Sequence, residues 1–285
     1  MGAGDGDETM RVTFHGVRGS TPCDRPEIAR YGGNTSCVVI EAADEADLLL
    51  DIGTGARSRG LELEAQRRAF RGVCLVSHLH WDHIQGLPFF SPLRDPDSEM
   101  VIYAPAQDGG RHPDEVLAET IRPPLFPIGL HDFNGHVEVR VAPAEMSHGG
   151  YEIRSAPVPH CGPTNGYRIE RAGRSVAYVS DHQQPANPLT VADSVIDLCA
   201  GVDLLIHDAQ YTPSEFRHKP DWGHCTVEYA VWLAAHVGAR RLALFHHDPD
   251  RDDEQLDRLA EMARACGDSL VVDVFAAAEG LTVAV

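Results

Sequence analysis

The sequence is short of positive charge. It contains 24 Lys and Arg residues against 43 Asp and Glu residues, which gives a formal net charge of −19. A surface of that sign repels long polyanions, because proteins bind nucleic acid largely by neutralising phosphates with cationic side chains. We therefore do not expect a long nucleic acid as partner. A small anion in a metal-lined pocket is compatible with this charge, since bound metal ions dominate the local field.

Long apolar runs and paired cysteines are also missing. No apolar run reaches the roughly 20 residues that a membrane-spanning helix needs, so we expect no membrane partner. The first ten residues, MGAGDGDETM, are acidic and glycine-rich, unlike a signal peptide. The seven cysteines include no CxxC pair, which is typical of reduced thiols in a cytoplasmic protein. We predict a cytoplasmic protein whose residues 1–9 form a flexible tail.

Short apolar runs alternate with turn signals over the rest of the chain. Two runs around an acidic turn at 43–46 predict a β-hairpin. Strands predominate in the first and third quarters, and alternating strands and helices close each half. No composition break marks a linker, so residues 10–285 are predicted to form one α/β domain with two β-rich lobes flanked by helices. Helices are expected at 55–70, 113–121, 189–200, 226–238 and 252–267, and the penultimate strand at 269–275.

The segment VSHLHWDH, residues 76–83, places four potential metal ligands directly after an apolar strand. They are His78, His80, Asp82 and His83. In a short turn, this HxHxDH pattern can direct two histidines at one divalent ion and the Asp–His pair at a neighbouring ion. Two ions about 3.5–4 Å apart activate water and stabilise an in-line displacement.

Two ions need more ligands than one motif supplies. His160, Asp181 and His246 each follow an apolar, β-like run. Ligands of α/β proteins gather beyond the carboxyl ends of strands, so we predict that these residues complete a dinuclear metal site. His247 is a rival to His246, and the role of His182 is left open.

These motifs resemble those of the metallo-β-lactamase-fold hydrolases over nearly the whole chain, which implies a four-layer αββα fold with two β-sheets flanked by helices. Asp51 in LLLDIGTG matches the family's first motif, an aspartate that orients the metal-binding loop. By this resemblance, one ion is held by His78, His80 and His160, the other by Asp82, His83 and His246, and Asp181 bridges the two. Zn²⁺ is the expected metal and Mn²⁺ the alternative, because His/Asp sites accept several metals.

Two further segments resemble those of phosphodiesterases within this family. LLIHDAQYT and WGHCT resemble segments of tRNA 3′-end nucleases, in which an acidic residue and a histidine lie together beside the metals. The matching residues are Asp208 and His224. A carboxylate beside an imidazole favours the protonated ring, which can donate a proton to a leaving oxygen. Asp82, Asp208 and His224 are therefore the predicted catalytic residues.

The substrate prediction depends on a second resemblance. The segments GVRGSTP, RYGGNTSC and RPPLFPIGL resemble those of cyclic-nucleotide phosphodiesterases of the anti-Pycsar type. This implies a homodimer that hydrolyses 3′,5′-cyclic mononucleotides to nucleoside monophosphates, and the loop at 105–135 is a segment that could reach the partner. Arg18 and Asn34 are the candidate substrate contacts.

Three alternatives stay open. The chain is otherwise a phosphodiesterase for another small cyclic phosphate, a tRNA 3′-processing endonuclease, or a nucleotide-binding protein without turnover. The tRNA nucleases carry a substrate-grasping arm between their third and fourth motifs. Here only a tight turn and two strands fit between His160 and Asp181, which argues against a tRNA substrate.

Overall fold

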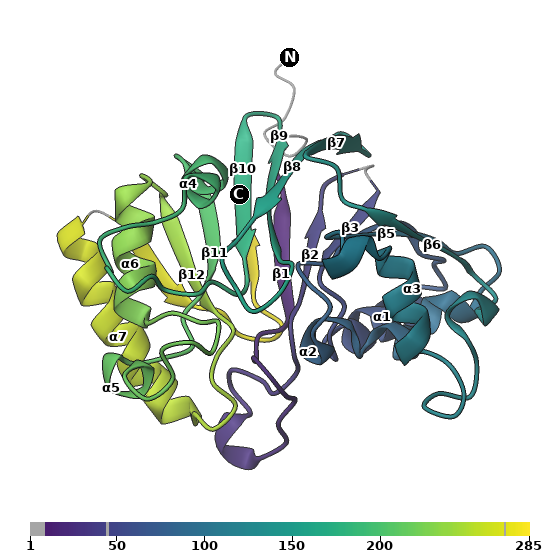
Figure 1. Cartoon of the computed structure of the whole chain (residues 1–285), viewed down its shortest axis with the longest axis horizontal. Coiled ribbons are helices and arrows are strands. Elements are labelled where there is room, and N and C mark those ends of the chain that lie inside the picture. Colours follow the sequence, from purple (N-terminus) through teal and green to yellow (C-terminus); the bar gives the residue numbers. More distant parts are fainter. Residues whose placement is uncertain (1–8, 44–45, 271) are drawn as a thin grey trace.

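The computed structural model describes residues 9–43, 46–270 and 272–285. The predicted tail lies outside this description except for Thr9, as do two residues of the predicted acidic turn. Within the described ranges, two seven-stranded sheets pack face to face, and helices cover the outer face of each (Figure 1). The predicted four-layer αββα fold is thereby confirmed.

The first sheet has the strand order β14-β1-β2-β3-β4-β5-β6. β2 and β3 pair antiparallel as predicted, whereas β3 to β6 run parallel. Its strands are β1 (Arg11–Gly16), β2 (Cys37–Glu41), β3 (Asp47–Leu50), β4 (Arg71–Leu75), β5 (Glu99–Ala104), β6 (His136–Val141) and β14 (Thr282–Ala284). On its side of the molecule lie α1 (Ala56–Ala65), α2 (Trp81–Ile84) and α3 (Pro113–Thr120) (Figure 1).

The second sheet has the order β13-β12-β11-β10-β9-β8-β7, with β10 to β13 parallel. Its strands are β7 (Glu145–His148), β8 (Tyr151–Pro157), β9 (Asn165–Arg171), β10 (Arg174–Val179), β11 (Leu204–Asp208), β12 (Arg241–Phe245) and β13 (Asp273–Ala276). The helices on this side are α4 (Asp193–Cys199), α5 (Pro213–Phe216), α6 (Val227–His236) and α7 (Asp253–Leu270) (Figure 1).

Two details differ from the sequence prediction. β7 was not predicted, because its sequence EMSH is polar and the strand lies at a sheet edge, paired only with β8. The predicted strand at 269–275 begins later, at Asp273, because α7 continues to Leu270. The buried positions of that helix repeat at helical spacing as far as Gly267.

Side-chain alternation along the central strands fills three apolar layers. In β10, Val176 and Tyr178 lie in the layer between the sheets, whereas Ala177 and Val179 pack towards the helices. Strands buried on both faces read as continuous apolar runs, which is why the sequence identified them. Polar side chains are then left to the strand ends. No helix in the described ranges is long and apolar enough to cross a membrane.

Candidate metal centre and active site

The predicted ligands of both halves of the chain meet at one edge of the sheets. His78 and His80 follow β4, Asp82 and His83 lie on α2, His160 follows β8, Asp181 follows β10 and His246 follows β12. Among the described residues, groups whose ligand atoms lie within 4.8 Å of one another include His78–His80–His160, Asp82–His83–His246 and His78–His83–Asp181. These groups match the ligand sets predicted for two ions and a bridging aspartate.

The first group consists of three imidazoles. Nε2 of His78 lies 2.8 Å from Nδ1 of His80, which lies 3.4 Å from Nε2 of His160. Burial lowers the pKa of all three rings below the usual 6.5. The rings are therefore neutral at pH 7, the form that binds a metal.

The second group adds a carboxylate. Oδ2 of Asp82 lies 3.1 Å from Nε2 of His246 and 3.2 Å from Nε2 of His83. Burial disfavours charge here, but His83 and His246 outweigh it and lower the pKa of Asp82 below its usual range. The backbone N–H of Ser20 also donates to Oδ2 of Asp82 at 2.7 Å. Asp82 is consequently held as a charged, oriented acceptor.

Asp181 lies between the two groups. Its Oδ1 is 3.9 Å from Nε2 of His78 and 3.5 Å from Nε2 of His246, and its Oδ2 is 3.3 Å from Nε2 of His83. Both carboxylate oxygens of Asp181 and Nε2 of His83 are buried and form no hydrogen bond with any described residue. Unsatisfied buried polar atoms are costly. A divalent cation would coordinate these oxygen and nitrogen atoms and so satisfy them, which means that the site fits metal binding.

The ring nitrogens that face away from the cluster have partners of their own. Nδ1 of His83 donates to Asp51 at 2.7 Å, Nδ1 of His160 to the carbonyl of Gly223 at 2.7 Å, and Nδ1 of His246 to Oε1 of Gln210 at 3.1 Å. Such outer partners fix the tautomer and orientation of metal-binding histidines. Asp51 therefore contacts His83, one of the predicted ligands.

Asp51 is itself held by several donors. It accepts from the backbone N–H and the hydroxyl of Ser77 at 2.6 and 2.9 Å, and from the phenol of Tyr178 at 2.7 Å. Its φ of 58° is in the left-handed region, which is uncommon outside glycine. This network links the loop after β3 to the second sheet through Tyr178. Tyr178, Ser20 and Gln210 are not among the predicted site residues, because nothing in their local sequence indicates these contacts.

Asp208 and His224 form the predicted pair. Nδ1 of His224 donates to Oδ2 of Asp208 at 3.0 Å, and the same nitrogen is 3.7 Å from Oδ1 of Asp181. Because Nδ1 is engaged, Nε2 is the ring nitrogen available to a ligand. The backbone N–H of His182 also donates to Asp208. The pair thus adjoins the metal ligands.

A cleft of about 460 Å³ opens onto this cluster. Its lining comprises Ser20, Leu79, His80, Trp81, Asp82, Asp181, His224 and His246. The side chain of Trp81 is 58% exposed, which leaves an aromatic face at the rim. Volumes of this size accommodate small organic ligands.

Arg18 does not line this cleft, although it was expected to contact the substrate. Its side chain is fully buried and donates to the backbone carbonyls of Gly32, Asp248 and Arg251. The guanidinium therefore joins the N-terminal loop to the segment after β12. Asn34 is also committed elsewhere, because its amide donates to Glu279 at 2.9 Å. An adjacent carboxylate disfavours phosphate, so neither predicted substrate contact is supported.

His182 and His247, whose roles the sequence did not decide, are both buried. Nε2 of His247 donates to the carbonyl of Ala277 at 2.9 Å, and burial lowers the pKa of His247 to about 3. His246, rather than His247, lies in the ligand cluster. Nδ1 of His182 lies 3.0 Å from Nε2 of His207, which precedes Asp208 at the end of β11. His182 therefore contacts the end of that strand.

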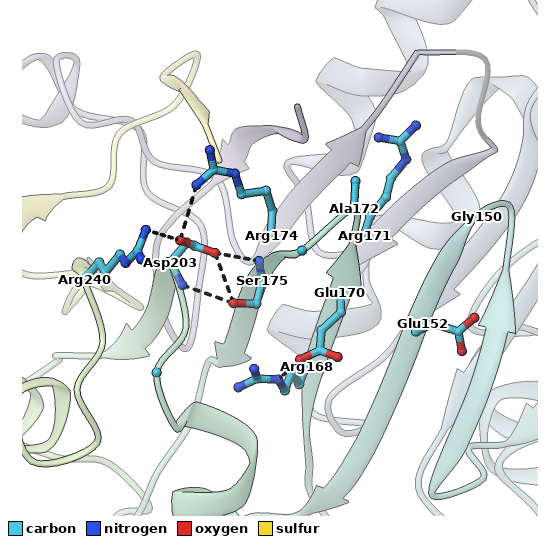
Figure 2. Close-up of a pocket in the computed structure, with 12 residues that line it drawn as sticks. Gly150, Glu152, Arg168, Glu170, Arg171, Ala172, Arg174, Ser175, Asp203 and Arg240 are labelled. Carbon is cyan, nitrogen blue, oxygen red and sulfur yellow. Dashed lines mark hydrogen bonds and ion pairs between the residues drawn. The ribbon is translucent and has the colours of Figure 1, made fainter. Parts of the chain in front are cut away.

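A larger cavity, about 510 Å³, lies apart from the metal cluster, around the turn between β9 and β10. Figure 2 shows Arg174 and Arg240 directed at Asp203, with Arg240 Nη1 at 3.0 Å from its carboxylate. Arg168 is similarly paired with Glu170 at 2.6 Å. The lining of this cavity carries four arginines and three acidic residues. Three of these arginines pair with lining carboxylates, so size alone does not make the cavity the functional site.

The fold and the His/Asp cluster together define a metal-binding protein with two sheets enclosed by helices. A family model described as "Beta-lactamase superfamily domain" matches residues 47–247. The chain belongs to this superfamily, as the sequence motifs predicted.

The chain is also similar to curated relatives and to solved structures. The chain is 25% identical to a Ribonuclease Z of Haloarcula marismortui, covering 93% of this chain and 94% of the relative. A Ribonuclease Z of Synechococcus is also 25% identical over 84% and 85%.

Among solved structures, the metallo-β-lactamase fold protein YhfI from Bacillus subtilis has a TM-score of 0.74 at 19% identity, covering 98% of this chain and all of that one. A diphosphatase of the PhnP family gives 0.68 at 20% identity, with 96% and 97% covered. The short form of human tRNase Z gives 0.66 at 22% identity, with 96% and 98% covered. These structures support the fold alone.

Proposed function

We propose that the chain is a metal-dependent phosphodiester hydrolase that binds two divalent ions, Zn²⁺ in the first place and Mn²⁺ as the alternative. The observation that carries the proposal is the convergence of two three-residue ligand groups on Asp181, beside the Asp208–His224 pair. His78, His80 and His160 would hold one ion, and Asp82, His83 and His246 the other. Asp181 would bridge them.

The chain's own side chains supply orientation and proton transfer. Bound divalent ions contribute Lewis-acid charge at phosphate oxygens and activate water. Asp208 accepts from Nδ1 of His224, a residue that lines the cleft, and so leaves Nε2 as the ring nitrogen available to a substrate. From there His224 can stabilise charge on the phosphoryl group or protonate the leaving oxygen. Asp82, oriented by the Ser20 N–H, helps to position the attacking water.

For the substrate, we propose a 3′,5′-cyclic mononucleotide or a closely similar small cyclic phosphate. The chain between His160 and Asp181 forms only β9 and β10, joined by a turn at Ala172 and Gly173. No arm that would grasp a long RNA is built there. The net charge of −19 and the compact cleft support the same preference.

The second candidate is processing of RNA 3′ ends. It is favoured by a specific observation, the full-length similarity to curated relatives named Ribonuclease Z. This candidate requires an RNA-binding surface on a strongly acidic protein. The two candidates share the metal centre and differ in what lies around it.

The test measures products from both substrate classes with the same metal-loaded protein. Chromatography follows cAMP, cGMP, cCMP and cUMP, and gel analysis follows a precursor tRNA with a 3′ extension. We expect a nucleoside monophosphate from at least one cyclic nucleotide and no cleavage by Asp82→Ala. Cleavage of precursor tRNA alone would reverse the order of the two candidates. Turnover of neither class, with metal bound, would contradict both the cyclic mononucleotide and the RNA candidate and leave only another small cyclic phosphate.

A variant of His224 separates catalysis from metal binding. His224→Ala is expected to lower kcat by about 10²–10⁴-fold while the metal content, measured by atomic emission, stays near that of the wild type. Equal loss of metal and of turnover would instead assign His224 a structural role.

We also propose a cytoplasmic homodimer. The side chains of Leu125, Phe89 and Ile128 are 70, 55 and 37% exposed, and Phe89 packs on Phe126 with ring centroids 5.8 Å apart. Phe126, which contacts Phe89, lies between Leu125 and Ile128 in the sequence, and a contiguous exposed apolar patch supports association. All seven cysteines are free thiols, which supports the location. Light scattering that gives a monomer mass would contradict the dimer.

A further inference from the structure

A third cavity lies beside the Asp208–His224 pair, against the first turns of α6. Its volume is about 350 Å³. The lining comes from the segment after β10, from α5 and from α6, and comprises Gln184, Pro188, Leu189, Pro213, Phe216, Thr226, Glu228, Tyr229 and Trp232. Most of these side chains are apolar. The rings of Tyr229 and Trp232 pack with centroids 5.6 Å apart at 34°, so the cavity offers flat aromatic walls.

Two polar side chains also line the cavity, Glu228 as an acceptor and Gln184 as a donor. Oε2 of Glu228 is buried and has no hydrogen-bond partner among the residues that the structure describes. A buried carboxylate oxygen without a donor is costly. Oε1 of Gln184 accepts from the N–H and the hydroxyl of Thr226, both at 3.0 Å. The side-chain amide N–H groups of Gln184 therefore remain available to donate to a ligand.

We propose that this cavity binds a planar heteroaromatic ring that carries an N–H or amino donor, as nucleobases do. Aromatic side chains stack on the face of such a ring. A carboxylate accepts from exocyclic amino groups, and an amide N–H donates to a ring nitrogen or carbonyl. A purely apolar ligand would leave the Glu228 oxygen unsatisfied, so the polar edge is part of the fit.

The cavity is coupled to the catalytic pair through short contacts. The backbone N–H of Gln184 donates to the carbonyl of His224 at 3.1 Å. Thr226 follows His224 by two residues, and its hydroxyl accepts from the N–H of Tyr229 to cap α6. A ring bound here therefore touches the residues that hold His224. This inference goes beyond the proposed hydrolysis, because it concerns a cavity that contains none of the proposed metal ligands. Binding to this cavity can be measured without turnover.

The experiment titrates guanosine, adenosine, cytidine and uridine into the full-length, metal-loaded protein by calorimetry and tryptophan fluorescence. Nucleosides lack phosphate, so the metal centre does not dominate their binding. We expect saturable binding of at least one nucleoside whose base carries an amino group. Trp232→Ala and Glu228→Gln should each raise its Kd at least tenfold, with melting curves confirming that both variants fold.

Matched controls are available outside the cavity. Trp222 is 62% exposed and Glu261 lies on the exposed face of α7, so Trp222→Ala and Glu261→Gln should change the Kd less than twofold. Absence of saturable binding by any of the four nucleosides up to their solubility overturns the proposal. Binding that is equally strong in wild type, Trp232→Ala and Glu228→Gln also overturns it.

The bound ring has two sources, the base of the substrate or a separate molecule. If it is the substrate's base, Trp232→Ala raises KM for cyclic nucleotides but not for bis(p-nitrophenyl) phosphate, which has no base. If it is a separate effector, adding the nucleoside changes kcat for bis(p-nitrophenyl) phosphate. Hydrolysis of that substrate also tests the metal centre by itself, so failure of the cavity proposal is distinguishable from failure of the proposed function.

Discussion

At the scale of single residues, the metal centre depends on the ring nitrogens that do not face the ions. Each of His83, His160 and His246 donates its Nδ1–H to a different kind of acceptor: a carboxylate, a backbone carbonyl and a side-chain amide. A backbone carbonyl cannot be removed by substitution, and Asp51 has several other donors. Gln210, the partner of His246, is the contact that mutation isolates best.

We expect Gln210→Leu to weaken binding at one of two metal sites. The substitution removes the acceptor of His246 Nδ1–H and leaves the tautomer of that ring unfixed. Loss of such a partner typically lowers metal affinity about 10–100-fold. Competition with a chromophoric chelator should show one weakened site and one unchanged site. Gln66→Leu is the control, since Gln66 is exposed at the end of α1. Two unchanged sites in Gln210→Leu would contradict the role.

Glu228 gives a pH-dependent stability with a defined sign. Burial raises the pKa of Glu228 above the usual 4.5. A carboxyl with a raised folded-state pKa adds stability that is fully present below the unfolded pKa and lost as pH rises through the folded pKa. At pH 7 its charge therefore costs stability. Glu228→Gln is expected to raise Tm at pH 7, and the difference should shrink as the pH falls towards about 4.

The control for this prediction is Glu261→Gln, an exposed change on α7. It should shift Tm little at either pH. A Tm difference for Glu228→Gln that is equal at both pH values would show that the carboxyl's charge is not responsible.

Some of these residues were within reach of the sequence and others were not. The ligands stand out because several His and Asp residues follow apolar strands at short spacing. Arg18 was misassigned because burial by distant segments, near Asp248 and Arg251, leaves no local pattern. Gln210 was missed for the same reason, since its partner His246 lies 36 positions away.

At the scale of elements, strand interiors were predictable and loops were not. Central strands are buried on both faces, so their apolar runs are continuous. The edge strand β7 has alternating polar residues and lacked that signal. The conformation of the segment before α6 depends on Gly223, whose φ is +92° and whose carbonyl accepts from His160.

Gly223→Ala is expected to disturb metal binding as well as folding. An alanine Cβ at this position would lie 2.4 Å from Cε1 of the His160 ring, so the ring must move. The comparison is Gly201→Ala, where φ is +62° and no atom lies within 4 Å of the new Cβ. Both variants should lose about 1–2 kcal/mol from left-handed backbone strain. Chemical denaturation measures that loss. Only Gly223→Ala should also lose metal affinity, and equal affinities would contradict the clash.

At the scale of the whole molecule, the two sheets contribute to one site from different halves of the chain. The HxHxDH ligands follow β4 in the first sheet, whereas His160, Asp181 and His246 follow strands of the second. The packing of the two sheets therefore sets the distances between the ligand groups. The sequence indicated the ligands, but their separation is a property of the sandwich and could not be obtained from spacing along the chain.

The net charge of −19 gives a prediction that separates the two substrate classes. Repulsion between the protein and an anionic substrate is screened by salt, with a Debye length of about 30 Å at 0.01 M and about 10 Å at 0.1 M. We expect kcat/KM for a cyclic nucleotide to rise modestly over this range, measured at fixed metal concentration. Choline chloride in place of NaCl controls for specific ions.

A precursor RNA that binds through cationic contacts would show the opposite dependence of kcat/KM on salt, because salt weakens such binding. A kcat/KM for RNA that falls steeply with salt would thus reveal a local basic surface and favour RNA processing. A rise for both substrates would mean that the overall acidic field governs encounter, as the composition predicts.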